Sequence, residues 1–504
     1  GSEMCIRDRS GTYALYKAQL SKNIGVNTTT HGLAYYINYV KGTDITAATL
    51  NPSTSYEGGA SSDIEFWKKD DSYDIYGKIE LTVNTIGTNL SNSPALKYAV
   101  VNNGNVLKEG SLKGTTSGSK VTILKNLYLE QTKQIYTVYV WLDNSEELGN
   151  ISNESLSISV DCTASLQKEP TAADTIISLY TSAAKVTATN NSITYNTAPS
   201  VSLMNDRLGG TTTDLDGGNI RYYGASPNNY IYFNCSDYSN QTSSTCETWR
   251  IIGVFDGKLK LIRNESIGNY SWDNKNTSTG AESANGKNDW TTARLMKLLN
   301  PSDYYTVDSN DNNLGQSLYY NSASGKCYSG QNNATVDCDF TSTGIKDTTR
   351  NMIAETTYYL GGWNSSSVYP NEIYEYERGT TVYTGRTTTP WTGKIALAYP
   401  SDYGYAADLN QCKQTLYNYD NSTCTSNNWM KAIITNNGSN HGWLLTPHSN
   451  CSYIAWDVIL SGIMGGNRAY YSSYGAAPVL YLSSELGIES GGDGSSSNPY
   501  KLSA

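Results

Sequence analysis

The sequence predicts an all-β sandwich in the N-terminal third of the 504-residue chain and an α+β region after it. Three observations support this division. The chain is too long for one hydrophobic core, which predicts two or three domains. Short alternating strands separated by polar turns fill residues 11–168. Hairpin and helix patterns are mixed in residues 201–504.

The N-terminal region has the alternation of half-buried strands. Apolar and polar residues alternate in KIELTV (78–83), in residues 135–142 and again in residues 156–160. Several short strands with polar turns between them predict an antiparallel β-sandwich of immunoglobulin-like type over residues 11–168, acting as a spacer. Within it, residues 14–20 are predicted as a short helix.

Two segments flank the predicted sandwich. Residues 1–10 (GSEMCIRDRS) are interpreted as a tail of cloning and adaptor sequence, so the natural N-terminus, with any export signal or anchor, is expected to be missing. Residues 169–200 connect the two regions, because Pro170–Asp174 breaks the strand pattern and a helix pattern follows at residues 175–184. The Thr- and Asn-rich residues 185–200 are predicted as a loop or an edge strand.

The second region, residues 201–504, contains mixed elements. A hairpin is predicted over Trp249–Ile262, because two apolar strands flank the turn pair Asp256–Gly257. A helix is predicted over Asp289–Asn300, with Asp289 as its N-cap and a proline after it. Further elements are predicted as a helix over residues 347–360 and as strands over residues 394–398, 443–445 and 479–482.

The composition limits the classes of partner. Charged residues make up 16% of the chain, the net charge is −10 and no basic block occurs, which argues against nucleic-acid binding. No apolar run is long enough to span a membrane. The 42 tyrosines against 4 phenylalanines suit the strand faces of an extracellular β protein, an exposed binding surface, or both.

Nine cysteines suggest an oxidising compartment, and one of them, Cys5, is set aside with the tail of residues 1–10. Six of them bracket three short polar loops that lack a core of their own, so a disulfide across each loop would stabilise it. Zinc is the alternative, but close Cys-x-x-Cys or histidine spacing is absent. The sequence therefore predicts an exported protein, with Cys162 and Cys451 either paired or free. The candidate disulfides are Cys235 with Cys246, Cys327 with Cys338, and Cys412 with Cys424.

No catalytic or cofactor motif is complete. Asp214–Asn219 and Asp308–Asn313 offer oxygen ligands suited to Ca²⁺, but neither forms a full EF-hand loop, and polar turns are the favoured interpretation. His448 and Cys451 stand close in sequence, which leaves a Cys/His enzyme as the least favoured alternative. GxSxG, phosphate-loop and HExxH motifs are absent. We therefore expect a protein that is not an enzyme and requires no cofactor.

Residues 449–477 combine Tyr, Ser, Gly and Asn, the residue types that adaptable binding loops favour. Ala455–Val458 and Pro478–Leu482 look like framework strands, whereas Ile459 and Ile463 stand beside tyrosines without a helical or strand period. An exposed apolar and aromatic patch usually marks an interaction site. The candidate ligand-binding residues are Tyr453, Asp457, Ile459, Ser461, Ile463, Asn467, Arg468, Tyr470, Tyr471, Ser473 and Tyr474.

Six strings in residues 201–501 form a distinctive set: LMNDRLGG (203–210), GGNIRYYGASPNNYIYFNC (217–235), WRIIGVFDGKLKLIRNESIGNYSWD (249–273), GKIALAYPSDYGYA (393–406), GWLLTPHS (442–449) and AAPVLYL (476–482). The set resembles large surface proteins of gut Firmicutes and related uncultured bacteria. The C-terminal domain of these proteins is similar to C-type-lectin and formylglycine-generating-enzyme folds. Where the family more often has Val-Arg before the last proline, this chain has Ala476-Ala477.

The resemblance implies a C-type-lectin-like domain over residues 201–504, with two helices and a small twisted antiparallel sheet. Some members of this fold are targets of diversity-generating retroelements, which rewrite a C-terminal cassette while the frame is kept. The resemblance thus implies a secreted or cell-surface, adhesin-like protein that binds a protein or glycan on another cell, phage or host surface. Neither the sugar-binding tripeptides of calcium-dependent lectins nor the active cysteine pair of formylglycine-generating enzymes has a match here. A pilus-like or surface-layer subunit is the alternative.

Overall fold

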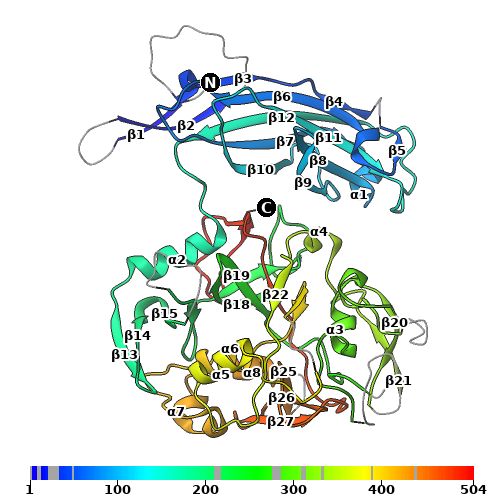
Figure 1. Cartoon of the computed structure of the whole chain (residues 1–504). Coiled ribbons are helices and arrows are strands. Elements are labelled where there is room, and N and C mark those ends of the chain that lie inside the picture. The colour runs from blue at the N-terminus through cyan, green and yellow to red at the C-terminus, as the bar shows by residue number, and fades with distance from the viewer. Residues whose placement is uncertain are drawn as a thin grey trace. The chain divides into compact units, whose positions relative to one another are not determined.

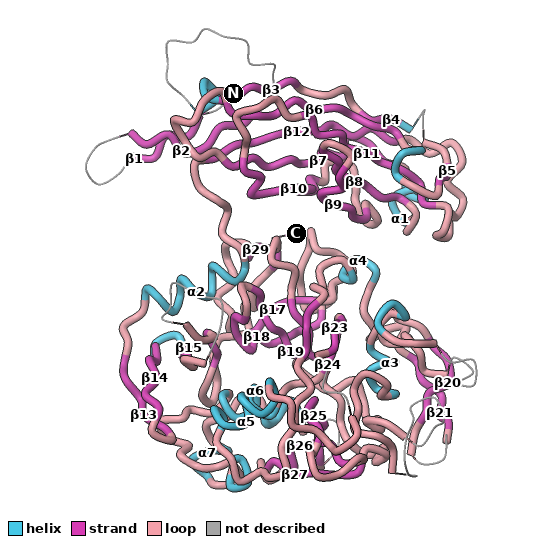
Figure 2. The backbone as a smooth tube through the Cα atoms, viewed as in Figure 1, coloured by secondary structure: helices cyan, strands magenta, loops and turns pink. Residues whose placement is uncertain are grey.

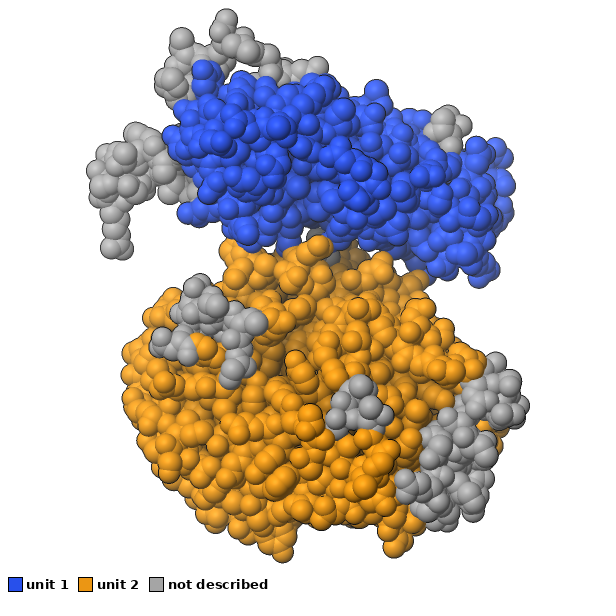
Figure 3. Space-filling view, viewed as in Figure 1, with its two compact units in different colours: residues 1–169, 504 blue, residues 170–503 orange. Residues whose placement is uncertain are grey.

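The structure is a computed structural model of the chain. It describes the backbone of residues 3–7 and 13–20, and residues 33–47, 50–208, 217–274, 285–307, 314–330, 334–386, 390–435 and 440–503. Strand residues (37%) outnumber helical residues (15%) and the sheets are mainly antiparallel, which agrees with the expected mixture of all-β and α+β structure. The chain divides into two compact units, residues 1–169 and 170–503 (Figure 3).

Unit 1 consists of two six-stranded sheets around one core (Figure 1). Its elements are β1 (Glu3–Arg7), β2 (Tyr13–Leu20), η1 (Leu33–Tyr36), β3 (Ile37–Val40), β4 (Ile45–Thr46), β5 (Pro52–Ser53), η3 (Tyr56–Gly58), β6 (Ala60–Lys68), β7 (Tyr76–Ile86), α1 (Thr88–Asn92), β8 (Leu96–Asn102), β9 (Asn105–Ser111), β10 (Lys120–Tyr128), β11 (Ile135–Asp143) and β12 (Leu156–Ser165). One sheet has the order β1-β2-β12-β7-β10, with β4 paired to β12. The other has the order β3-β6-β11-β8-β9, with β5 paired to β11.

The alternation in the sequence corresponds to the two faces of these sheets. Ile79 and Val160 from the first sheet, and Phe66 and Val138 from the second, lie in one buried cluster. The residues between them in each strand point away from that cluster, as the period of two requires. Two sheets that share a core in this way form a sandwich, as the alternation predicts.

The helix predicted over residues 14–20 is wrong. These residues form β2, which pairs antiparallel with β1 on one side and with β12 on the other, where Leu20 lies opposite Cys162. Strand β1 falls within residues 1–10, for which the sequence predicts no element. Pairing with distant strands decides the backbone here, because local propensity is weak in such short segments.

Unit 2 is built on a nine-stranded sheet with short helices and long loops around it (Figure 2). Its strands are β13 (Val186–Asn190), β14 (Ile193–Ala198), β15 (Leu203–Asn205), β16 (Ile220–Tyr222), β17 (Tyr230–Phe233), β18 (Glu247–Phe255), β19 (Lys258–Arg263), β20 (Ser324–Tyr328), β21 (Thr335–Asp339), β22 (Thr356–Tyr358), β23 (Trp391–Gly393), β24 (Ile395–Ala396), β25 (His441–Pro447), β26 (Ile454–Ile459), β27 (Met464–Arg468), β28 (Val479–Tyr481), β29 (Gly487–Ile488) and β30 (Leu502–Ser503). Its helices are α2 (Ala172–Ser182), η4 (Pro199–Val201), α3 (Arg294–Leu299), η7 (Ser302–Tyr304), α4 (Asp347–Arg350), α5 (Pro370–Arg378), α6 (Pro400–Tyr405), η9 (Leu416–Asn418), α7 (Ser422–Thr425) and α8 (Lys431–Ile434).

The large sheet of unit 2 has the order β13-β14-β15-β16-β18-β19-β28-β24, with β17 paired to β18. The predicted hairpin is confirmed as β18 and β19, whose turn residues Asp256 and Gly257 both have positive φ, as a type I′ turn requires. Helix α2 confirms the helix predicted at residues 175–184 and begins earlier, at a capping box formed by Thr171 and Asp174. Strand β13 lies at the edge of the sheet.

Two helices predicted in this region are shorter than expected. Helix α3 begins only at Arg294, because the Asp289 carboxylate accepts hydrogen bonds from the amide and hydroxyl of Thr291 in a preceding turn. Helix α4 ends at Arg350, and β22 in the second half of the predicted helix pairs with β23 instead. Helices α5 and α6, which the sequence analysis missed, each begin with a proline that follows a tyrosine.

The three predicted disulfides are present, and Cys162 and Cys451 are free. Each disulfide closes a loop of 11 or 12 residues. Such local cross-links agree with an exported protein. In the part of the chain that the structure describes, no helix is both long and apolar enough to cross a membrane.

The free thiols of Cys162 and Cys451 should differ in reactivity. Cys162 is fully buried in the core of unit 1 and burial raises the pKa of its thiol, whereas Cys451 is partly exposed. A thiol reagent should therefore label Cys451 in the native, non-reduced protein and reach Cys162 only after denaturation. Peptide mass mapping of the label checks this, with Cys451→Ser as the control. Rapid native labelling of Cys162 would contradict the buried placement.

Candidate functional site

Most candidate residues lie on or next to the three-stranded antiparallel sheet β25-β26-β27. Strands β26 and β27 form a hairpin in which Ile454 lies opposite Arg468 and Val458 opposite Met464. Its turn is closed by hydrogen bonds from the Ile459 amide to the Ile463 carbonyl and from the Gly462 amide to the Ile459 carbonyl. The segment around Ile459 and Ile463, which shows no helical or strand period in the sequence, is therefore part of a regular hairpin.

Two glycines hide the strand period of β27. Gly466 lies opposite Trp456, and a Cβ atom there would be 3.3 Å from the Trp456 ring and 3.1 Å from Ile454. A Cβ atom at Gly465 would be 2.9 Å from the Ile459 side chain. The glycines thus leave room for the larger side chains of β26, at the expense of the alternating pattern.

A polar cluster joins all three strands of this sheet. The buried carboxylate of Asp457 on β26 lies 2.5 Å from Nδ1 of His441 on β25. Its other oxygen accepts a hydrogen bond of 3.0 Å from the side-chain amide of Asn467 on β27. Burial raises the pKa of Asp457, although both hydrogen-bond partners favour the ionised form. The cluster holds the three strands in one register.

Aromatic rings cover this polar cluster. The ring of Tyr474 stacks on His441 with 4.2 Å between centroids and 4° between planes, and lies 4.6 Å from the ring of Trp443. Tyr471 follows at 5.5 Å from Tyr474, and Tyr470 at 4.7 Å from Tyr471. The row runs from buried Tyr474 to partly exposed Tyr470. It gives the surface a rigid aromatic edge.

The candidate residues differ in exposure. Asp457 and Tyr474 are buried, at 0% and 7% exposure. The partly exposed candidates are Tyr453, Ile459, Ile463, Asn467, Tyr470 and Tyr471, and the exposed candidates are Ser461, Arg468 and Ser473. Leu460, which was not among the candidates, is 51% exposed at the tip of the hairpin. We call the partly exposed and exposed candidates, together with Leu460, the display surface.

The display surface offers apolar, phenolic, hydroxyl, amide and guanidinium groups, which suit non-covalent recognition. Among the described residues, no three His, Cys, Asp or Glu side chains are grouped as a metal site would need. Of the two segments considered for Ca²⁺, Asp308–Asn313 and the aspartates of Asp214–Asn219 lie outside the described residues.

His448 and Cys451 have separate neighbours. Nδ1 of His448 accepts a hydrogen bond of 3.2 Å from the Asn450 amide, and its ring lies 5.0 Å from the Trp456 ring. Burial lowers the pKa of His448. The Cys451 thiol is a hydrogen-bond partner of the Tyr453 hydroxyl, a contact that raises the pKa of Tyr453.

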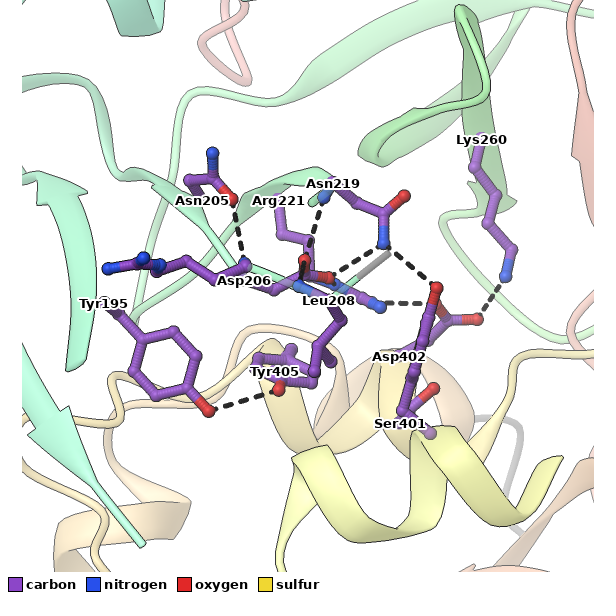
Figure 4. A network of polar contacts seen from close by, with 12 residues as sticks. Tyr195, Asn205, Asp206, Leu208, Asn219, Arg221, Lys260, Ser401, Asp402 and Tyr405 are labelled. Carbon is purple, nitrogen blue, oxygen red and sulfur yellow. Dashed lines mark hydrogen bonds and ion pairs between the residues drawn. The ribbon is translucent and has the colours of Figure 1, made fainter. Parts of the chain in front are cut away.

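A buried ion network holds the large sheet of unit 2 to α6 (Figure 4). Arg221 on β16 bridges Asp206, whose carboxylate lies 2.6 Å from Nε, and Asp402 on α6, at 3.1 Å from Nη1. Lys260 on β19 lies 2.5 Å from the other oxygen of Asp402. All four side chains are at most 1% exposed. The network was not predicted from the sequence, although charged residues inside the short apolar strands β16 and β19 are a usable signal.

No protein-family model and no curated protein matches this chain.

Proposed function

We propose that this chain is a secreted or cell-surface bacterial binding protein of adhesin-like function, and that the display surface contacts its ligand. The observation that carries the proposal is the exposure of Leu460 at the turn of the β26–β27 hairpin and of Arg468 at its other end, with partly exposed Tyr470 following β27, around the buried Asp457–His441 pair. Exposed apolar and aromatic groups on a rigid base are typical of interaction sites. The three disulfides are consistent with an extracellular location.

In this proposal the candidate residues have two roles. Tyr470 and Tyr471 are aromatic anchors, Arg468 is a charged contact, and the other members of the display surface adapt to the ligand. Asp457 and Tyr474 support the surface from below, because both are buried. A fixed support under variable contacts preserves the fold while the specificity changes.

We further propose that unit 2 is C-type-lectin-like, that unit 1 is an immunoglobulin-like spacer, and that residues 449–477 are diversified by a retroelement. Comparison of gene copies from one microbial community tests the last point. Differences should concentrate at codons of the display surface, match adenines in a neighbouring near-repeat, and spare Asp457 and Trp456. An even spread of differences without a near-repeat would support a fixed adhesin or a structural subunit.

Alanine variants should distinguish residues that contact the ligand from buried residues that support the display surface. Tyr474→Ala should destabilise unit 2 by about 3 kcal/mol, because it removes a buried ring that stacks on His441 and packs against Trp443. Tyr470→Ala should change stability by less than about 1 kcal/mol and weaken binding about tenfold or more, as expected for an exposed aromatic anchor. Denaturant unfolding measures the first effect. Binding of the labelled protein to gut microbial cells measures the second.

The Tyr470→Ala result decides whether the tyrosine is an anchor. Unchanged cell binding with unchanged stability would exclude Tyr470 from the ligand contact. A large loss of stability would show that it belongs to the core. Tyr417→Ala, which removes an exposed tyrosine outside the display surface, serves as the matched control and should affect neither quantity.

A further inference from the structure

The lysine–aspartate pair in the buried ion network has an unusual environment. Nζ of Lys260 lies 2.5 Å from Oδ2 of Asp402, and the two residues are 142 positions apart in sequence. The ammonium group also lies over three aromatic rings, at 4.5 Å from the centroid of Tyr399, 5.1 Å from Phe255 and 5.4 Å from Tyr481. The reactive ends of both side chains are therefore enclosed by protein and shielded from water.

Burial distinguishes this pair from ion pairs of equal length elsewhere in the chain. Lys133 with Glu65, and Lys326 with Asp337, also have N–O distances of 2.5 Å, but their lysines are 53% exposed. Water stabilises the separate charges of those pairs. The enclosed pair lacks this solvation, which raises the free energy of its charged form relative to a neutral product. The N–O distance alone therefore does not distinguish the Lys260–Asp402 pair from these exposed pairs, whereas its burial does.

The groups around the pair act on both reactants: Lys260 and Arg221 hold Asp402 ionised, so a proton passes from the ammonium group to the carboxylate before the amine attacks its carbon. Burial lowers the pKa of Lys260 to about 8, so part of the population carries the nucleophilic free amine near neutral pH. Nη1 of Arg221 donates a 3.1 Å hydrogen bond to Oδ1 of Asp402. That donor stabilises the negative charge that develops on the oxygen when the carbon is attacked.

The charges of the network remain balanced if the pair becomes neutral. The network contains two cations, Arg221 and Lys260, and two anions, Asp206 and Asp402. Loss of one cation and one anion leaves Arg221 paired with Asp206 at 2.6 Å. No buried charge is left without a partner, which would otherwise oppose the reaction.

We propose that Lys260 and Asp402 condense to an intramolecular amide bond after folding. Nζ forms a bond to Cγ of Asp402, and the bond from Cγ to one carboxyl oxygen breaks. That oxygen leaves as water with two of the hydrogens of the ammonium group, so ammonium and carboxylate become amide and water without any oxidant or cofactor. The bond closes a covalent loop between β19 and α6 and makes unit 2 resistant to unfolding, as suits a protein exposed outside the cell.

Mass spectrometry of the purified full chain tests this bond. After reduction and denaturation, the intact protein should be lighter than its sequence mass by one water molecule. Proteolysis should yield a branched peptide that joins Lys260 to Asp402. Lys260→Arg keeps the charge but cannot form this amide, and should restore the full sequence mass. Lys258→Arg, on the same strand and partly exposed, is the matched control and should keep the water loss.

The measured mass and the peptide map together decide whether the Lys260–Asp402 bond is present. The full sequence mass, with Lys260 and Asp402 found in separate linear peptides, would overturn the proposal and leave an ion pair only. A water loss that maps to other residues would also overturn it. A mixture of both masses that includes the branched peptide supports it. If Lys260→Arg fails to fold, the mass and peptide map of the unaltered chain still decide, with Lys133 and Glu65 expected in linear peptides.

Discussion

Replacing Asp206 with alanine should destabilise unit 2 by about 3–5 kcal/mol, the cost of removing one partner from a buried ion pair. The carboxylate is fully buried and accepts hydrogen bonds from the Leu208 amide (2.9 Å), the Asn219 amide (2.8 Å) and the Asn219 side chain (3.0 Å). It also carries the ion pair to Nε of Arg221. The variant leaves a buried guanidinium undercompensated and three donors without this acceptor.

Denaturant unfolding, followed by tryptophan fluorescence, measures this loss. Asp337→Ala is the matched control, because Asp337 also forms an ion pair, with Lys326 at 2.5 Å, but is 87% exposed. The control should cost less than about 1 kcal/mol, the usual value of an exposed ion pair. Equal stability of Asp206→Ala and the control would show that the network does not hold the sheet to α6.

The stability of unit 2 should fall as the pH rises from about 4.5 to about 7, because of Glu377 on α5. Burial raises the pKa of this fully buried carboxyl from 4.5 to about 7, against hydrogen bonds from Ser401 and the nearby Arg378. The folded state therefore binds the proton more tightly than the unfolded state. The stabilising contribution is present below pH 4.5 and is lost as the pH passes through 7, and the shift corresponds to roughly 3 kcal/mol.

Glu377→Gln isolates this contribution. Glutamine imitates the neutral acid and keeps its hydrogen bonds to Ser401, so unfolding free energies between about pH 4 and about pH 8 should vary less than in the unaltered chain. Glu375→Gln, exposed on the same helix, is the control and should leave the pH profile unchanged. An unaltered profile in Glu377→Gln would mean that this carboxyl does not titrate in that range.

Other buried carboxyls affect the same profile, among them Asp457, whose pKa burial also raises. Burial raises the pKa of Asp273 to about 7, so its contribution has the same sign as that of Glu377 and persists in the Glu377→Gln variant. In chains that lack the proposed bond to Lys260, the contribution of Asp402 has the opposite sign. Although burial opposes its ionisation, Lys260 and Arg221 hold its pKa below the ordinary value, so its contribution is lost only as the pH falls through that lower range.

The features predicted correctly from the sequence depend on short-range information. The hairpin around Asp256–Gly257 follows from turn residues that accept positive φ. The three disulfides join cysteines only 11 or 12 residues apart. The sandwich strands of unit 1 follow from a period of two that each strand shows by itself. Each of these features is encoded within about a dozen neighbouring residues.

The errors occur where a distant partner decides the structure. Residues 14–20 form a strand because β12 pairs with them, and residues 356–358 form a strand because β23 does. In the hairpin of the display surface, Gly465 and Gly466 remove the alternation that would have revealed β27. Local sequence cannot supply this information, since the pairing energy comes from a strand elsewhere in the chain.

By itself, the sequence determined the mainly β character of the chain, its local disulfides and the segment that carries the display surface. Only the tertiary structure decided which residues of that segment are exposed, and that Asp457 and Tyr474 are its buried support. Only the tertiary structure also brought Lys260 and Asp402 together across 142 residues. The physical reason is that burial and ion pairing depend on which surfaces meet when the chain folds, and these surfaces come from segments far apart in sequence.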